Sequence, residues 1–175
     1  MGRHTLEYRR GVYAENVFLE IAEREGYKVI KSDTKDDMFK HIDFYLTKDD
    51  DRIAVDVKSR KKAGRNSSTF DDIYTWVEFK NVRGDKGWLY GEADKIAFER
   101  KEDFVLINRE CLLNYCLETV QPVSVDSPQE ATYKHYTRRN RNDLLSRIKI
   151  RKLFNSRFVS EPLIIWKKDV DMSNQ

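Results

Sequence analysis

Two aspartates and a lysine with the chemistry of a cation site lie within residues 41–60, HIDFYLTKDDDRIAVDVKSR. Segments rich in β-branched and aromatic residues flank the turn-forming residues 48–51, so the pattern predicts a β-hairpin. If the hairpin closes symmetrically, Asp43 faces Asp56, and Lys58 shares the face of Asp56. Carboxylates opposed at about 4.5–5.5 Å repel each other. A divalent cation between them removes that repulsion, and oxygen ligands suit Mg²⁺ or Mn²⁺.

Three other acidic residues also stand two positions before a lysine, so this triplet alone has little weight. They are Asp33, Glu78 and Glu99. Asp33 lies in a polar stretch, and Glu99 lies near the tip of a second predicted hairpin, where both charges are expected to be solvated. Only Asp56 combines an apolar strand with an acid in facing register. The alternative is an exposed cross-strand ion pair, which explains Lys58 but not two facing aspartates.

A glutamate on a predicted helix is a candidate third ligand. Residues 12–25 carry apolar side chains at helical spacing, and Gly26 suits the end of a helix. Glu15 borders the apolar stripe and could reach over the sheet toward the hairpin, whereas Glu20 falls on the solvent side. The alternative for Glu15 is an ordinary charge at the edge of the stripe. The stripe consists of Ala14, Val17, Phe18, Ile21 and Ala22.

Glu15 in a helix, Asp43 in a strand and Asp56-Val57-Lys58 thirteen residues later resemble the PD-(D/E)xK nuclease superfamily, in particular its resolvase-like branch. The similarity covers roughly residues 11–60. It implies a restriction-endonuclease-like fold, a Mg²⁺ or Mn²⁺ cofactor and an endonuclease that hydrolyses phosphodiester bonds of DNA. Ile42 replaces the proline of the motif, at a position that is loosely kept in the superfamily. Branched DNA and phage or host DNA are open as substrates, and so is a homodimer.

The resemblance also implies roles for single residues. Asp43 and Asp56 bind the metal directly, and the backbone carbonyl of Val57 is a further ligand. Glu15 holds a metal-bound water or a second ion. We expect Lys58 to orient the attacking water and to pair with the phosphate rather than with Asp56. Burial lowers the pKa of a lysine and nearby carboxylates raise it, so an electrostatic role is favoured over that of a base.

Two locally basic segments suit contacts with a phosphate backbone. One follows the candidate site, and the other spans residues 131–160, which hold nine Lys and Arg against one acidic residue. Solvated charge is the alternative for both. Tyr133, His135 and Tyr136 could stack on bases or pack within the protein. The candidate nucleic-acid-binding residues are Arg60, Lys61, Lys62, Lys80, Arg138, Arg139 and Arg141, and the first segment also includes Arg65.

The order of elements predicts an α/β fold, borderline α+β, with a mixed β-sheet flanked by helices. We expect one domain over residues 1–175, with a catalytic core at 11–108 and a helical, basic C-terminal part at 109–175. Trp88, in a glycine-rich loop, fits either a core position or a wedge in DNA. The other predicted elements are a strand at 27–30, a polar connection at 32–40, a loop at 61–72, a strand at 74–81, a hairpin at 94–99 and 104–108, a helix at 110–119, a loop at 121–130 and a strand at 163–166. A helix capped by Asn142-Asp143 is predicted from Leu144, and its end stays open because Ile148, Ile150 and Leu153 also alternate as in a strand.

Composition limits the class of protein. The 175 residues are 39% hydrophobic, which is enough for a core, and 36% charged with a net charge of +3, so the net charge alone does not indicate a nucleic-acid binder. No apolar run approaches the roughly 18 residues of a membrane span. Cys111 and Cys116 are expected to be free, buried thiols. We expect a cytoplasmic protein of a bacterial or phage-infected cell.

Two alternatives to a nuclease stay open. One is a non-catalytic nucleic-acid-binding module that keeps the fold, and the other is a structural domain with coincidental charge. Zinc chemistry is disfavoured because the three histidines are scattered along the chain.

Overall fold

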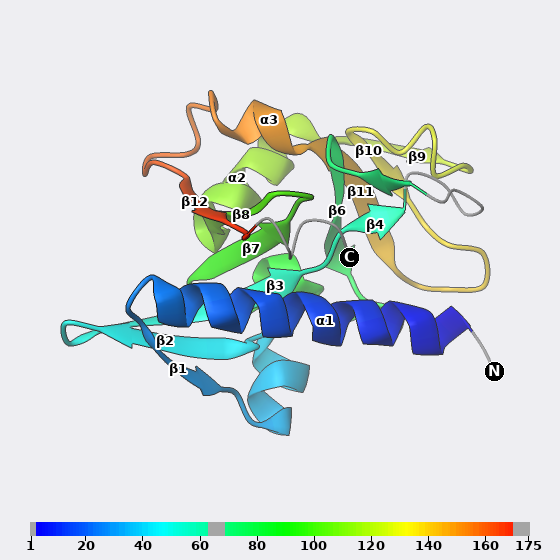
Figure 1. The fold of residues 1–175 in the computed structure, drawn as a ribbon. Coiled ribbons are helices and arrows are strands. Elements are labelled where there is room, and N and C mark those ends of the chain that lie inside the picture. The colour runs from blue at the N-terminus through cyan, green and yellow to red at the C-terminus, as the bar shows by residue number, and fades with distance from the viewer. Residues whose placement is uncertain (1–2, 63–68, 170–175) are drawn as a thin grey trace.

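A six-stranded mixed β-sheet forms the centre of the protein in a computed structural model that describes residues 3–62 and 69–169 (Figure 1). Neighbouring strands are antiparallel except β3 and β7, which are parallel. Helices cover both faces, so the predicted mixed sheet flanked by helices is confirmed. In spatial order the strands are β1 (Lys28–Lys31), β2 (Phe44–Lys48), β3 (Asp51–Lys58), β7 (Lys95–Glu99), β8 (Asp103–Asn108) and β12 (Ile164–Lys167).

The helix α1 (Arg3–Arg24) packs against one face of this sheet. All five residues of the predicted apolar stripe are buried there. The Phe18 ring stacks on Phe44 of β2 and on Trp166 of β12, with centroid distances of 5.9 and 5.3 Å. The helix begins well before the predicted residue 12. It ends as predicted before Gly26, whose φ of 87° is a left-handed conformation that glycine adopts readily.

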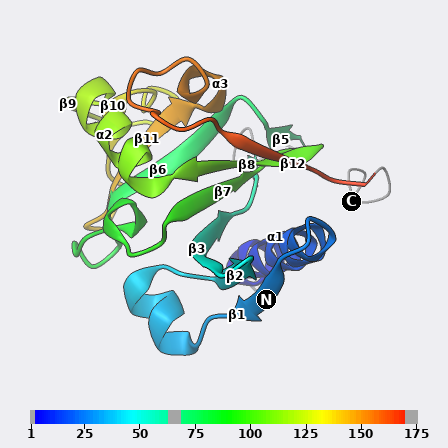
Figure 2. The same ribbon diagram turned by 90° about the vertical axis from the view of Figure 1, so that its left-hand side faces the viewer.

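A second, four-stranded sheet and the helix α2 (Arg109–Thr119) cover the other face (Figure 2). Val77 and Phe79 of β6 and Leu112 of α2 share one apolar cluster with Ile96 of the first sheet. Trp88 lies in the same cluster and is only 7% exposed, so it is a core residue and not a wedge. In spatial order the second sheet contains β6 (Tyr74–Lys80), β11 (Leu144–Lys149), β10 (Lys134–Tyr136) and β9 (Gln121–Val125).

The C-terminal third differs from the prediction. Residues 144–149 form β11 instead of the start of a helix, and β9 lies within the predicted loop at 121–130. β11 pairs with the distant β6, and this pairing outweighs the local helical pattern. Asp143, the predicted helix cap, is buried and accepts hydrogen bonds from Arg138. A short helix, α3 (Ile150–Leu153), begins only where β11 ends.

Short elements complete the described chain. A π-helix, η1 (Asp36–Lys40), lies in the predicted polar connection, and a 3₁₀ turn, η2 (Trp88–Tyr90), lies in the glycine-rich loop. Within the predicted loop at 61–72, β4 (Lys61–Lys62) and β5 (Phe70–Asp71) pair with each other. Arg65 lies outside the described residues.

Both cysteines of α2 are free thiols as predicted, and Cys116 is buried, but the expected burial of Cys111 is wrong because its side chain is partly exposed. Burial blocks access to Cys116 and raises the pKa of its thiol, and the thiolate is the reactive form. We therefore expect iodoacetamide to label Cys111 and to spare Cys116 in native buffer, measured by fragment-ion mass spectrometry of the peptide that holds both. In urea both should react. Equal labelling of the two thiols in native buffer would contradict the burial of Cys116.

Candidate active site

The β2–β3 hairpin has the predicted register. Asp49 and Asp50 close it with φ of 49° and 70°, which is the geometry of a two-residue turn that matches strand twist. Thr47 lies opposite Arg52, as expected from the symmetric closure. The local sequence therefore sets the frame on which the acidic residues stand.

Asp43 lies where this hairpin ladder ends. Its backbone N–H donates to the Val55 carbonyl at 2.9 Å, so Asp43 leaves the regular ladder before it can pair directly with Asp56. The chain turns at His41, which has a left-handed φ of 55°. The Asp43 carboxylate accepts a hydrogen bond from the Val57 N–H at 2.6 Å, and this contact holds it beside Asp56. The two carboxyl groups lie side by side, as predicted. The hydrogen bond from the Val57 N–H to Asp43 positions them, rather than direct strand pairing of Asp43 with Asp56.

Asp56 and Lys58 form a largely buried ion pair on β3. Val55 and Val57 pack toward α1, so the alternating side chains of Asp56 and Lys58 point to the other side of the sheet. Lys58 Nζ lies 2.6 Å from Asp56 Oδ1, and the two side chains are 26% and 3% exposed. The ammonium also lies 4.9 Å from the centre of the Trp88 ring. The expectation that Lys58 does not pair with Asp56 is wrong for the protein alone.

The other Asp56 oxygen, Oδ2, is buried and has no hydrogen-bond partner within residues 3–62 and 69–169. Such an oxygen normally has a donor or a cation beside it. The adjacent Asp43 carboxyl group lies close enough to Asp56 for the two groups to interact electrostatically. The pair therefore presents an unsatisfied anionic oxygen that a cation would complete.

Electrostatics at the pair follow from burial and from the two like charges. Burial raises the pKa of Asp43 to about 8, and the charge of Asp56 adds to the shift. Burial also raises the pKa of Asp56, while Lys58 opposes that shift. For Lys58 burial lowers the pKa, but the charges of Asp56 and Asp43 outweigh it and the pKa is raised. Lys58 therefore stays protonated, which fits an electrostatic role better than that of a base.

Glu78 on β6 adds a third acidic group close to Lys58. Burial raises the pKa of Glu78, and the charge of Lys58 and a hydrogen bond from the Trp88 N–H lower it in part. The sequence offered two signals for this position, because Glu78 shares a strand face with Trp76 and Lys80 and also precedes a lysine by two. Its approach to Lys58 depends on the second sheet and was not predicted.

Gly87 allows β6 and η2 to approach each other at this wall. A Cβ there would lie 2.4 Å from the Glu78 carbonyl oxygen, a backbone atom that cannot move aside. We expect Gly87→Ala to lower the free energy of unfolding by about 1–3 kcal/mol or more, measured by urea denaturation. Gly11→Ala is the matched control, because no atom lies within 4 Å of its added Cβ in the middle of α1. It should stabilise the protein by about 0.5–1 kcal/mol. Equal effects of the two variants would contradict the close approach.

Glu15, the predicted third ligand, pairs with Lys31 of β1 at 2.8 Å. The structure does not bring its carboxylate to the Asp43–Asp56 pair, because α1 covers the sheet face opposite to Asp56. Its charge is still felt at Asp43, where it contributes to the raised pKa after burial and Asp56. Glu99, expected to be solvated, instead pairs with Lys168 in a nearly buried contact at 2.7 Å.

The site fits a hard divalent cation with few protein ligands. Within the described residues, no group of three or more His, Cys, Asp or Glu side chains could hold a metal ion. Mg²⁺ is commonly bound by one or two carboxylates, with waters and substrate phosphate as its other ligands. Asp43 and the unpartnered Oδ2 of Asp56 supply two such carboxylates.

The predicted nucleic-acid-binding residues fall into two groups. Arg60 and Arg138 are already engaged, because Arg60 pairs with Asp72 at 2.9 Å and Arg138 pairs with the buried Asp143. The others have exposed side chains with no ion pair among the described residues. They are Lys61, Lys62, Lys80, Arg139 and Arg141.

Lys61 links the basic residues to the candidate site. Its pKa is lowered, first by desolvation although part of the side chain is exposed, and then by the positive charges of Lys58, Arg10 and Arg138, while Glu7 raises it. Because three neighbouring positive charges oppose the protonation of Lys61, the electrostatic potential beside the carboxylates is positive. The predicted stacking residues, in contrast, are partly buried and contact other aromatic rings of the protein, as in the contact between Tyr136 and Trp76 at 5.8 Å.

No family model matches the chain, and no curated protein matches it. A solved structure, that of a bacterial homing endonuclease, I-Ssp6803I, is similar over 65% of this chain and 74% of that chain, with a TM-score of 0.45 and 18% sequence identity. We draw no function from a likeness this distant. No helix in the described part of the chain is long and apolar enough to cross a membrane.

Proposed function

We propose that the protein is a metal-dependent endonuclease that hydrolyses phosphodiester bonds of DNA with Mg²⁺ or Mn²⁺. One observation carries this proposal: in the Asp43–Asp56 pair, a buried carboxylate oxygen of Asp56 has no partner among the described residues and lies next to a protonated lysine. Acidic oxygens for a hard cation and an ammonium for a phosphate are the two chemical requirements of such a site.

Asp43 and Asp56 would hold the cation, with the Val57 carbonyl as the further ligand that the PD-(D/E)xK resemblance implies. A divalent cation bound there supplies Lewis-acid polarisation of the phosphate and acidifies a water. Lys58 places a fixed positive charge where negative charge develops on the phosphate. Trp88 packs under its ammonium and limits the positions that the side chain can take. Glu15, paired with Lys31, would act on Asp43 through its charge rather than as a ligand.

The positive potential around Lys61 would draw the DNA backbone toward the carboxylates. Lys62, Arg139 and Arg141 would extend the contact because they are exposed and have no ion pair within the described residues. Arg60 and Arg138 would support DNA binding indirectly, by positioning neighbouring residues, because each is already paired with an aspartate. Binding should therefore weaken steeply as salt concentration rises.

A substrate panel tests the proposal. The full chain is incubated with Mg²⁺, Mn²⁺ or EDTA and with supercoiled plasmid, linear duplex, single strand, RNA and a four-way junction. We expect nicking or linearisation of the plasmid with either metal and none in EDTA. Cleavage from ends only would replace the endonuclease by an exonuclease. If no substrate in the panel is cleaved with either metal, the proposed nuclease activity is rejected.

One observation favours a non-catalytic nucleic-acid-binding module as the second candidate. Glu15 pairs with Lys31, and Lys58 pairs with Asp56, so three of the four predicted catalytic groups are engaged in ion pairs inside the protein. Such a module would bind DNA with the same salt dependence but would show no divalent-cation binding by calorimetry. Calorimetric titration with Mn²⁺ therefore separates the two functions without a cleavage assay.

A further inference from the structure

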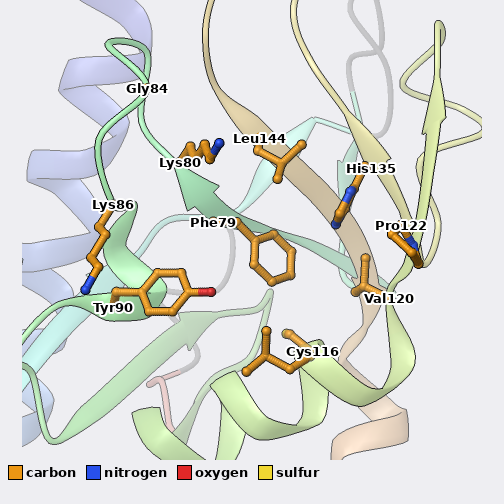
Figure 3. A pocket seen from close by; sticks show the side chains of 11 residues that line it. Phe79, Lys80, Gly84, Lys86, Tyr90, Cys116, Val120, Pro122, His135 and Leu144 are labelled. Atoms are coloured by element: carbon orange, nitrogen blue, oxygen red, sulfur yellow. The ribbon is translucent and has the colours of Figure 1, made fainter.

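A pocket of about 530 Å³ opens between η2, α2 and the second sheet, whose strand β6 also carries Glu78 (Figure 3). Its walls are mainly apolar, and Leu117 and Tyr90 at the pocket are 55% and 37% exposed. Exposed apolar side chains that line a concave surface often mark a ligand-binding site. The apolar walls come from Phe79, Cys116, Leu117, Val120, Pro122 and Leu144.

The pocket has few polar groups, and they are of two kinds. The Tyr90 hydroxyl points inward toward Phe79 (Figure 3), and His135 lies edge-on to the Phe79 ring at 5.6 Å. Burial lowers the pKa of His135, so its ring is neutral at pH 7 and can both donate and accept a hydrogen bond. Lys80 and Lys86 line the same pocket, are exposed, and have no carboxylate at ion-pair distance within the described residues.

This combination specifies the occupant. The apolar walls with one aromatic ring suit a flat ring system, the hydroxyl and the imidazole suit its polar edge, and two ammonium groups suit an attached anion. We propose that the pocket takes one nucleobase of the bound nucleic acid, with Lys80 and Lys86 on the phosphate of that nucleotide. The proposal rests on the proposed nuclease function and names its substrate class, a strand with an unpaired or extruded base.

The position of the pocket relative to the carboxylates supports this occupant. The charge of Glu78 acts on Lys58 and the Trp88 ring lies 4.9 Å from its ammonium, and Lys80 and Tyr90 lie two residues further along the same two segments. Two residues of a strand span about 7 Å, a separation that one nucleotide of an unstacked chain can bridge. A base in the pocket would leave a neighbouring phosphate near Lys58. Taking a base out of a duplex requires unstacking, so a mismatched, branched or single-stranded region is preferred.

Nucleotide binding without metal tests the pocket separately from catalysis. The full chain in EDTA is titrated with deoxyadenosine 5′-monophosphate, deoxyadenosine, inorganic phosphate and decanoate, followed by NMR line broadening and calorimetry. We expect the nucleotide to bind at least about tenfold more tightly than either of its parts, because the ring and the anion are both recognised. Leu117→Trp, which fills the mouth, and the double change Lys80→Gln with Lys86→Gln should each weaken binding by about tenfold or more.

Leu6→Trp and Lys152→Gln are the matched controls, since Leu6 is 58% exposed on α1 and Lys152 is exposed on α3. Both should bind the nucleotide like the original protein, and thermal unfolding checks that every variant is folded. Decanoate binding without nucleotide binding, or unchanged binding by Leu117→Trp, overturns the pocket proposal even if plasmid is cleaved. Nucleotide binding that these variants weaken, in a protein that cleaves no DNA, removes the nuclease and keeps the pocket.

Discussion

The Asp56→Asn variant is expected to bind no Mn²⁺ by calorimetry and to cleave plasmid at least about a thousandfold more slowly than the original protein. Asparagine keeps the shape of the side chain but removes the charge and the unpartnered carboxylate oxygen. Loss of the bound cation removes several kcal/mol of stabilisation from the reaction, and each 1.4 kcal/mol is about a factor of ten. DNA binding in EDTA should persist, because the exposed basic residues are unchanged.

The matched control is Asp51→Asn, on the same strand but exposed at the hairpin turn. It should cleave and bind Mn²⁺ at the original level. Thermal unfolding in EDTA is needed beside the assay, because asparagine leaves Lys58 without its 2.6 Å counter-charge. Cleavage by folded Asp56→Asn at the rate of the control would end the metal-site proposal.

The second large effect is expected for Lys58→Met, with opposite consequences for catalysis and for cation binding. Cleavage should fall by about a hundredfold or more, because the positive charge beside the phosphate is lost. Mn²⁺ binding should become tighter, because Lys58 pairs with the Asp56 oxygen next to the unpartnered one and repels a second cation. Calorimetry measures the affinity, and a plasmid assay measures the rate.

Stability gives an independent measure for the same variant. Removing one partner of a buried ion pair costs about 3–5 kcal/mol, so Lys58→Met should melt well below the original protein in EDTA. Mn²⁺ should restore more stability to the variant than to the original protein, since at the same concentration a ligand that binds the folded state more tightly stabilises it more. Lys95→Met is the control, because Glu161, its partner at 3.2 Å, is 58% exposed. Weaker Mn²⁺ binding by Lys58→Met would contradict the role of Lys58 as resident counter-ion.

The parts of the site that the sequence predicted are those that local chemistry determines. The turn at Asp49 and Asp50 sets the register of the hairpin, and the period of α1 sets its buried stripe. The meeting of Asp43 with Asp56 was predicted for the same reason, because only thirteen residues separate them. The exit of Asp43 from the ladder was not predicted, since it depends on the backbone turn at His41.

Distant contacts explain what the sequence did not predict. β6 pairs with β11 across more than sixty residues, and no periodicity within residues 144–149 encodes that partner. The same applies to charge: Arg60 is neutralised by Asp72 and Glu15 is held by Lys31, through contacts that only the fold creates. Counting basic residues in a segment therefore overstated the number of free cations.

The strand order of the second sheet has a consequence for dividing this chain into working pieces. β6 stands at the edge of its sheet, and within residues 3–62 and 69–169 its one neighbouring strand there is β11. A fragment that ends at residue 108 would hold both aspartates and Lys58, yet it would leave β6 without a strand beside it. The wall that brings Glu78 and Trp88 to Lys58 is thus built with residues 144–149. The residues of the candidate site and the strands that position them therefore come from both halves of the chain. Shorter versions of the protein have to be made by trimming loops rather than by removing the C-terminal part.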